Sequence, residues 1–284
     1  MSNMESMKID LHAHSTASDG TDSPSQLALQ ACAAGLAVVG ITDHDTVDGW
    51  NSAAAAATET GVRLVRGMEL TATCHGARVH ILGYLFDPEN EAVRNHIYTV
   101  QASRENRARE ITERLAVDFP ITFDDVLAQA APDAVLGRPH IADALVKLGI
   151  IANRSEAFEQ ILSSSSPYYV SQYAPEAVDV VQFIQQAGGK TVWAHPWARA
   201  RGKVAPDSAF AELAEAGLFG VEVDHRDNPA DTRPALADIV KGCGLARFGS
   251  SDYHGTGKPN KLGENTTSED VYYQLIDGTF AEVI

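Results

Sequence analysis

The stretch KIDLHAHSTASDG at residues 8–20 is a short apolar strand that ends in two histidines one residue apart, followed by a polar loop. Side chains alternate across a strand, so His12 and His14 point to the same face. Two imidazoles aimed at one point suit a metal ion, and Asp19 follows in the loop. The chain has 10 histidines in 284 residues, so the meaning of this pair depends on the rest of the sequence.

Similar apolar runs recur on the carboxyl side of this stretch, with helical patterns between most of them. They are AVVGITDHD, VRLVRGMELTAT, RVHILGYLF, KTVWAHP, FGVEVDH and LARFGSSDYH. Ser23 followed by Pro24 is typical of a helix start, and further helices are expected near 50–59, 206–216 and 231–241. Strand–helix alternation predicts an α/β fold with a parallel sheet and outer helices, and about seven strands favour closure into a barrel.

Residues from about 90 to 165 interrupt this alternation and are predicted as successive helices. Their expected ranges are 90–115, 123–130, 139–148 and 155–162, and the run SSSSP at 163–167 is typical of a loop. We therefore predict three segments. Residues 1–95 form the first part of the barrel, residues 96–166 a helical insertion that covers the active site, and residues 167–284 the second part of the barrel.

Composition limits the classes of partner. The net charge of −16 argues against a scaffold for long nucleic acids, whose binding depends on neutralising many phosphates. No apolar run approaches the roughly 20 residues that span a bilayer, and the first residues show no secretory signal, so no membrane partner is expected. Three scattered cysteines match no zinc spacing and favour a reduced, cytoplasmic setting.

Potential metal ligands concentrate near the ends of the predicted strands, where functional residues of parallel α/β folds gather. Each residue alone has a plain alternative as a core, rim or capping residue. Chance does not readily bring such residues to seven strand ends at once. The nine candidate ligands are His12, His14, Asp19, His44, Glu69, His80, His195, Asp252 and His254.

The stretches DLHAHSTASDG, ITDHDT, GMEL, VHILGY, AHP and SSDYH resemble the PHP (polymerase and histidinol phosphatase) family, within the wider amidohydrolase-like metal enzymes. The resemblance covers roughly residues 8–90 and 165–256. It implies a distorted seven-stranded (β/α) barrel that holds two or three divalent ions. It also implies three ligand sets: His12, His14, Glu69 and Asp252; Glu69, His80 and His195; and Asp19, His44 and His254.

Such a centre suits the hydrolysis of phosphate esters. Three ions would bring six positive charges against three carboxylates, which leaves a surplus that attracts an anion. A hydroxide activated by the metals can attack phosphorus while paired ions hold the attacking and leaving oxygens. The mixed ligands suit Mn²⁺, Fe²⁺ or Zn²⁺ better than Mg²⁺, and the resemblance favours Mn²⁺. His225, in VDHR, is a candidate proton donor to the leaving group, with a simple rim position as the alternative.

The predicted insertion offers a second anion site. In QASRENRAREITER, Arg109 and Arg114 each follow a glutamate by four residues, so surface ion pairs explain them. Arg104 and Arg107 share a face and are better candidates for phosphate, with a solvated face as the alternative. In LGRPHIADAL a helix starts at Pro139, and the free N–H groups of its first turn favour anions. The predicted substrate-binding residues are Arg104, Arg107, Arg138 and His140.

Two anion sites predict a substrate with two phosphates, one cleaved and one held. The resemblance to stand-alone PHP phosphoesterases implies a nucleoside 3′,5′-bisphosphate, such as adenosine 3′,5′-bisphosphate, that loses its 3′-phosphate to give the 5′-monophosphate. The main alternative is a 5′-3′ exonuclease acting on short RNA or DNA oligonucleotides. A histidinol-phosphate-type phosphatase and a non-catalytic, metal-stabilised interaction module are further alternatives.

Overall fold

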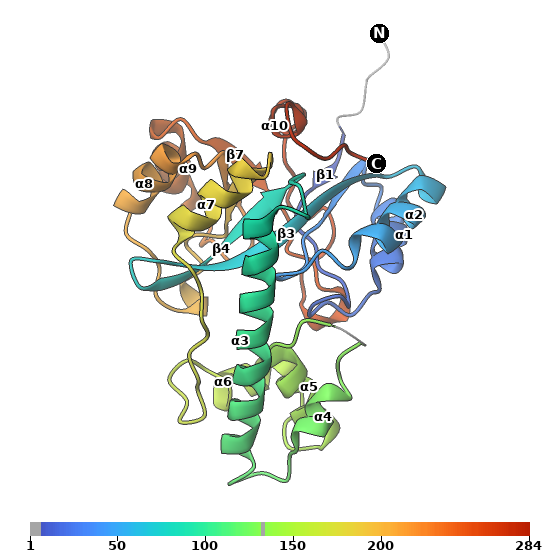
Figure 1. Cartoon of the computed structure of the whole chain (residues 1–284), viewed down its shortest axis with the longest axis vertical. Coiled ribbons are helices and arrows are strands. Elements are labelled where there is room, and N and C mark those ends of the chain that lie inside the picture. Colours follow the sequence, from blue (N-terminus) through green and yellow to red (C-terminus); the bar gives the residue numbers. More distant parts are fainter. Residues whose placement is uncertain (1–6, 132–133) are drawn as a thin grey trace.

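The computed structural model describes residues 7–131 and 134–284. Their strands form one seven-stranded sheet in sequential order, and a parallel bridge between Ala13 and Tyr253 joins the loops after its first and last strands. The sheet is thus a distorted, nearly closed barrel, as predicted (Figure 1). The strands are β1 (Ile9–Asp10), β2 (Val38–Ile41), β3 (Arg63–Cys74), β4 (Ala77–Tyr84), β5 (Lys190–Ala194), β6 (Gly220–Asp224) and β7 (Ala246–Gly249).

The expectation of a parallel sheet is wrong for β4, which pairs antiparallel with both β3 and β5. Only His75 and Gly76 separate β3 from β4, and both have positive φ, as a tight hairpin turn requires. The first half of β4 therefore lies beside the ends of its neighbours. His80 pairs with Ala194, the last residue of β5, so the hairpin brings this histidine to the edge where the other candidate ligands lie.

Helices pack outside the barrel. Helix α1 (Pro24–Ala33) begins where predicted, and the Ser23 hydroxyl accepts the Gln26 N–H as its cap. Helices α2 (Trp50–Thr60), α8 (Ser208–Ala216) and α9 (Arg233–Gly242) lie within two residues of their expected ranges at either end. The structure adds α7 (Ala177–Gln186) and α10 (Glu269–Ile276), which the sequence analysis did not anticipate. No helix in the described ranges is long and apolar enough to cross a membrane.

A helical lobe extends from one end of the barrel (Figure 1). It contains α3 (Glu91–Leu115), α4 (Phe123–Leu127), α5 (Arg138–Lys147) and α6 (Arg154–Gln160). The lobe has its own apolar core, to which Leu115 and Leu145 belong, whereas Val93 at the start of α3 packs in the barrel core. The predicted boundary between residues 95 and 96 falls inside α3, and the three-segment division stays a prediction.

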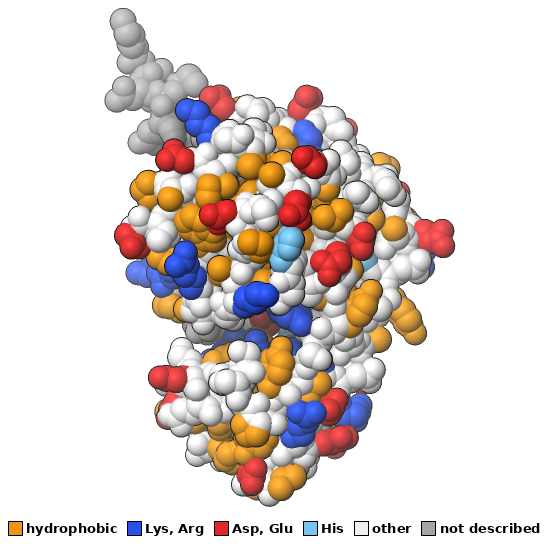
Figure 2. Space-filling model, turned by 90° about the vertical axis from the view of Figure 1, so that its left-hand side faces the viewer, with side chains coloured by type: hydrophobic (Ala, Val, Ile, Leu, Met, Phe, Trp, Pro, Cys, Tyr) orange, Lys and Arg blue, Asp and Glu red, His pale blue; other side chains and the backbone are white. Residues whose placement is uncertain are grey.

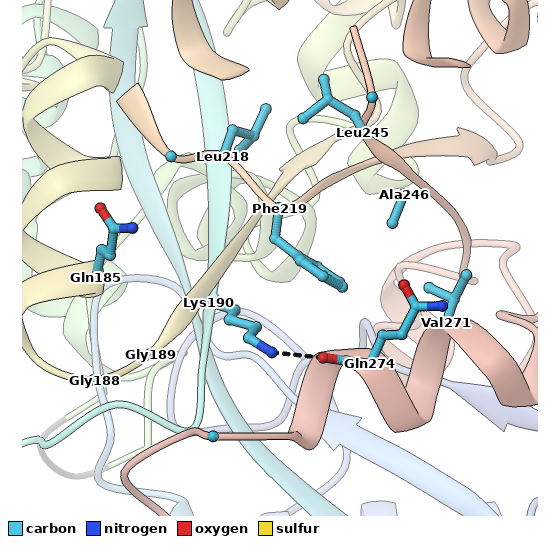
Figure 3. A pocket seen from close by; sticks show the side chains of 13 residues that line it. Gln185, Gly188, Gly189, Lys190, Leu218, Phe219, Leu245, Ala246, Val271 and Gln274 are labelled. Atoms are coloured by element: carbon cyan, nitrogen blue, oxygen red, sulfur yellow. Dashed lines mark hydrogen bonds between the residues drawn. The ribbon is translucent and has the colours of Figure 1, made fainter. Parts of the chain in front are cut away.

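A cavity of about 580 Å³ lies at the opposite end of the barrel from the candidate ligands. It is lined by the starts of β5, β6 and β7 and by α10 (Figure 3), and the Lys190 ammonium donates there to the Gln274 carbonyl oxygen. The candidate ligands lie at or beyond the other ends of these strands. The cavity is therefore separate from the candidate active site.

Candidate active site

The nine candidate ligands lie together where the barrel meets its carboxyl-end loops. Their ligand atoms form three groups within 4.8 Å: His12, His14, Glu69 and Asp252; His14, Asp19, His44 and His254; and His44, Glu69 and His80. His195 joins them, because its Nε2 lies 3.2 Å from Glu69 Oε1. The backbone at His195 and Asp252 has positive φ, a conformation that non-glycine residues seldom adopt outside functional sites and turns.

The first group joins the loop after β1 to β3 and to the loop after β7. His12 Nε2 and His14 Nε2 are 3.1 Å apart. They lie 3.3 and 3.0 Å from Glu69 Oε2, and both are 3.4 Å from Asp252 Oδ1. Two imidazole nitrogens and two carboxylate oxygens thus converge on one point, which is the geometry of a metal site.

The second group surrounds Asp19. His254 Nε2 lies 3.1 Å from Asp19 Oδ1, and His44 Nε2 lies 4.0 Å from Asp19 Oδ2. His254 Nδ1 lies 2.9 Å from the backbone oxygen of Asp252, which leaves Nε2 free to face the group. His14 also belongs here, because its Nδ1 is 3.7 Å from Asp19 Oδ1.

Glu69 links the groups from the middle of β3. Its Oε1 lies 2.7 Å from His80 Nδ1, and its Oε2 lies 3.3 Å from His44 Nδ1. The expected ligand sets differ from these groups in three ways: His14 belongs to two groups, His44 also belongs to two groups, and His195 is not a member of the group of Glu69 and His80.

The side chains fit divalent ions. Four buried atoms of the cluster have no hydrogen-bond partner among the described residues: Asp19 Oδ1, His44 Nδ1, Asp252 Oδ1 and His254 Nε2. Such orphaned atoms are rare in folded proteins and call for a bound ion or water. Burial, with the Lys258 charge nearby, lowers the pKa of His254 to about 4, and burial with the Arg201 charge lowers that of His195 to about 3. Both imidazoles are therefore neutral, the form that binds metals.

Two cations that the sequence analysis missed lie beside this centre. Asp252 Oδ2 accepts hydrogen bonds from Arg201 at 2.6 Å and from Lys258 at 2.9 Å, while its Oδ1 faces the histidines. About a third of each cationic side chain is exposed, and Arg201 also pairs with Asp227, so the two carboxylates partly balance the two cations. Each cation lies six residues after a candidate ligand, in a loop that carries no recognisable motif.

His225, the candidate proton donor, directly follows β6 (Gly220–Asp224) and is fully buried, and its role stays a prediction. Its Nδ1 accepts the Asp227 N–H at 3.0 Å, which places the proton of the neutral ring on Nε2. Nε2 lies 3.8 Å from Asp252 Oδ2 and has no hydrogen-bond partner among the described residues. The ring therefore holds a free donor next to the metal centre.

Arg104 has an acidic partner that does not lie on its own helix. Its Nε donates to Asp45 Oδ2 at 2.8 Å and its Nη2 to Thr71 Oγ1 at 2.8 Å. Burial alone would raise the pKa of Asp45, but the Arg104 charge and the contacts with His96 and His44 together outweigh burial and hold the pKa well below its usual range. Because Asp45 follows His44, this ion pair joins α3 to a loop of the metal centre.

Arg104 belongs to an arginine cluster, which we define as Arg78, Arg104, Arg107 and Arg138. Three members donate to backbone oxygens: Arg78 to Gln172, Arg107 to Val170 and Arg138 to Leu162, at 2.7–2.9 Å. Arg104, Arg107 and Arg138 surround a small gap beside Gly137 that is too small to hold a water molecule and is otherwise lined by apolar side chains. Figure 2 shows Lys and Arg side chains gathered in the hollow between barrel and lobe.

The cluster carries more positive charge than its surroundings neutralise. Burial, with the charges of Arg138 and Arg78, lowers the pKa of Arg107 to about 9. Among the described residues, the carboxylate paired with the cluster is that of Asp45. Arg78 was not predicted, because a single arginine on a strand gives no signal in the sequence.

His140, also predicted to bind substrate, has a local role. It is buried, and its Nδ1 accepts the Gly137 N–H at 3.1 Å, which caps the start of α5. Its use as a substrate ligand stays a prediction.

The sequence of this chain is similar to those of known proteins. Residues 10–188 match the model of the PHP domain family. A 5′-3′ exoribonuclease from Haemophilus influenzae is 32% identical over 256 residues, which cover 87% of this chain and 90% of that protein. A 3′,5′-nucleoside bisphosphate phosphatase from Chromobacterium violaceum is 31% identical over 251 residues, 88% of each chain.

Solved structures agree on the fold. A candidate metal-dependent phosphoesterase from Bifidobacterium adolescentis has a TM-score of 0.92 and 40% identity, covering 95% of this chain and 96% of that one. An amidohydrolase from Chromobacterium violaceum with bound sulfate has a TM-score of 0.85 and 29% identity, covering 94% and 95%.

Proposed function

This chain belongs to the PHP domain family and is a metal-dependent phosphoesterase, and on that premise we propose that it removes the 3′-phosphate from nucleoside 3′,5′-bisphosphates such as adenosine 3′,5′-bisphosphate. The products are the 5′-monophosphate and inorganic phosphate. The observation that carries the proposal is the arginine cluster near the metal centre, which we propose as a second anion site.

The nine clustered residues are the proposed ligands of two or three divalent ions. Mn²⁺ is the proposed metal, with Fe²⁺ and Zn²⁺ as alternatives that the same donor atoms accept. When bound, the ions supply Lewis acidity toward the phosphoryl group and activate the attacking water. The ligands are His12, His14, Asp19, His44, Glu69, His80, His195, Asp252 and His254.

Other side chains complete the proposed site. Arg201 and Lys258 flank Asp252 and favour an anion at the mouth of the centre. His225 keeps an unpartnered Nε2–H beside the centre, so it is the proposed proton donor to the leaving 3′-oxygen, a step that requires the ring to take up a second proton first and so return to the neutral form.

The arginine cluster would hold the 5′-phosphate. Guanidinium groups bind phosphate oxygens through paired, charge-assisted hydrogen bonds. Backbone oxygens and Asp45 already fix these guanidiniums, so little ordering is needed when the substrate binds. An incoming phosphate would also neutralise the surplus positive charge of the cluster.

A 5′-3′ exonuclease acting on short oligonucleotides is the second candidate, because the Haemophilus influenzae relative is an exoribonuclease. The same two sites would then hold a 5′-terminal phosphate and the first phosphodiester. The arginine cluster disfavours a histidinol-phosphate-type phosphatase, whose substrate has one phosphate. The orphaned ligand atoms disfavour a non-catalytic module. Action in the cytoplasm on small nucleotides, with no membrane or long nucleic acid as partner, completes the proposal.

Phosphate release by the Mn²⁺-loaded protein tests the proposal. Adenosine 3′,5′-bisphosphate, 3′-AMP, 5′-AMP and a short 5′-phosphorylated RNA are compared as substrates. We expect kcat/KM to be highest for the bisphosphate and phosphate to come from its 3′ position. Faster release of 5′-mononucleotides from the RNA would favour the exonuclease. Equal, slow release from all the mononucleotides would contradict a second anion site.

A further inference from the structure

Glu222, in the middle of β6, is a buried carboxylate that neither the sequence analysis nor the proposed function assigns. Its side chain is 1% exposed. Oε1 lies 2.8 Å from His12 Nδ1 and also accepts the Ser250 hydroxyl, and Oε2 accepts the His195 N–H at 3.0 Å. One carboxylate therefore connects the loops after β1, β5 and β7, and each of these loops carries candidate metal ligands.

The bond to His12 determines which ring nitrogen is free. A carboxylate accepts hydrogen bonds and cannot donate one when ionised. Oε2 is occupied by the His195 N–H, and Oε1 by the Ser250 hydroxyl beside His12 Nδ1, so the carboxyl group acts as the acceptor toward His12. The proton of His12 therefore lies on Nδ1, and Nε2 is free to face Glu69 and Asp252.

The bond to His195 acts on the backbone. This residue has a φ of 31°, a conformation that costs free energy for any residue other than glycine. Its N–H points into the barrel at Glu222 Oε2, while its side chain reaches Glu69. The hydrogen bond compensates part of the strain and fixes the direction of the imidazole.

We propose that Glu222 is a positioning residue that prepares two ligands at once, His12 by selecting its tautomer and His195 by holding its backbone. This inference rests on the proposed metal centre and not on the identity of the substrate. Partners behind a metal ligand commonly change metal affinity by about 10–100-fold. Because His12 and His195 belong to different expected ligand sets, losing Glu222 affects more than one ion.

Glu222→Gln is a discriminating variant, because glutamine cannot satisfy all three donors. An amide has one oxygen and one NH₂ group. If the oxygen stays near His12 and Ser250, the NH₂ group opposes the His195 N–H. If the amide turns over, the NH₂ group opposes His12 and favours the tautomer with a proton on Nε2, which cannot bind a metal there.

Titration calorimetry of metal-free protein with Mn²⁺ tests the inference. We expect Glu222→Gln to bind Mn²⁺ about 10–100-fold more weakly than the wild type, with turnover restored by excess Mn²⁺. Asp224→Asn is the matched control on the same strand, because Asp224 pairs with Arg247 at the surface, away from the centre. Wild-type affinity in a folded Glu222→Gln protein would overturn the proposal.

A second measurement needs no variant, so it holds even if Glu222→Gln does not fold. In zinc-loaded wild-type protein with ¹⁵N-labelled histidine, we expect His12 to carry its proton on Nδ1 and the metal on Nε2. The opposite assignment would overturn the inference. Neither measurement uses a substrate, so failure of the bisphosphate proposal would leave both results unaffected.

Discussion

Glu69 contacts imidazoles from both the strands and the loops of the metal centre. It is 1% exposed on β3, and burial alone would raise its pKa, but the surrounding imidazoles outweigh burial and hold the pKa well below its usual value. It therefore remains an ionised carboxylate within a buried site. The imidazoles within 3.3 Å of its oxygens are those of His12, His14, His44, His80 and His195.

Glu69→Gln should remove most of the activity. The amide lacks the charge that offsets the ions, and only its oxygen can bind a metal. Since metal activation contributes several kcal/mol to such reactions, we expect kcat to fall about a hundredfold or more, with fewer ions bound in elemental analysis. Glu212→Gln is the control, because Glu212 is exposed and bonds to His75 away from the site. Full activity and metal content in Glu69→Gln would contradict the assigned centre.

The double substitution Arg104→Ala and Arg138→Ala tests the second anion site. Hydrogen bonds to charged groups contribute about 1.5–3 kcal/mol each, so we expect the loss of two to raise KM for the bisphosphate about a hundredfold or more, with a smaller change in kcat. Steady-state kinetics with the bisphosphate and with 3′-AMP separates the two effects. Arg109→Ala is the matched control on α3, because Arg109 pairs with Glu105 on the exposed surface. An unchanged KM would show that the cluster is structural.

The sequence was informative about residues whose role shows in a local motif. His12, His14 and Asp252 follow short strands, and the structure brings them within 3.4 Å of one another. It was uninformative where a partner comes from another part of the chain. Asp45 lies 59 residues before Arg104, and Glu222 lies 210 residues after His12. Such contacts depend on closure of the barrel, which no local pattern encodes.

For helices and strands too, the sequence predicted what a local pattern shows and missed what depends on the rest of the chain. Helices with a cap or a clear apolar period were predicted close to their observed bounds, such as α1 with its Ser23 cap. The direction of β4 was wrong, because a strand pattern shows alternation but not orientation. The two-residue turn at His75 and Gly76 was the available signal, since a parallel crossover needs about a dozen residues.

The helical lobe should open more easily than the barrel, because its apolar core is small and separate. Leu145→Ala removes a fully buried side chain from that core, which typically costs about 2–5 kcal/mol. We expect hydrogen exchange to quicken in α4, α5 and α6 while β3 and β4 keep their protection. Leu29→Ala, at an exposed position of α1, is the control. Uniform loss of protection would mean that lobe and barrel unfold together.

At the scale of the whole molecule, the net charge of −16 contrasts with the positive arginine cluster, in which Arg104 joins the lobe to the barrel through Asp45. A nucleoside 3′,5′-bisphosphate, whose two phosphates each carry about −1.5 to −2 at pH 7, would interact mainly with arginines and metals. A longer polyanion would also meet the rest of a protein whose net charge is negative. Electrostatic repulsion therefore disfavours long substrates relative to short ones, even where the bond to be cleaved is the same.

This separation predicts an unusual dependence on salt. At low ionic strength we expect kcat/KM for 5′-phosphorylated oligonucleotides to fall as they lengthen from two to about ten nucleotides, since surface repulsion reaches over roughly 10 Å at 0.1 M salt. Raising the salt concentration screens this repulsion, so the difference between short and long substrates should shrink. Stopped assays at several salt concentrations, with adenosine 3′,5′-bisphosphate as the reference, measure the effect. A higher kcat/KM for longer strands at low salt would instead indicate a basic surface that binds nucleic acid outside the arginine cluster. That result would favour the exonuclease.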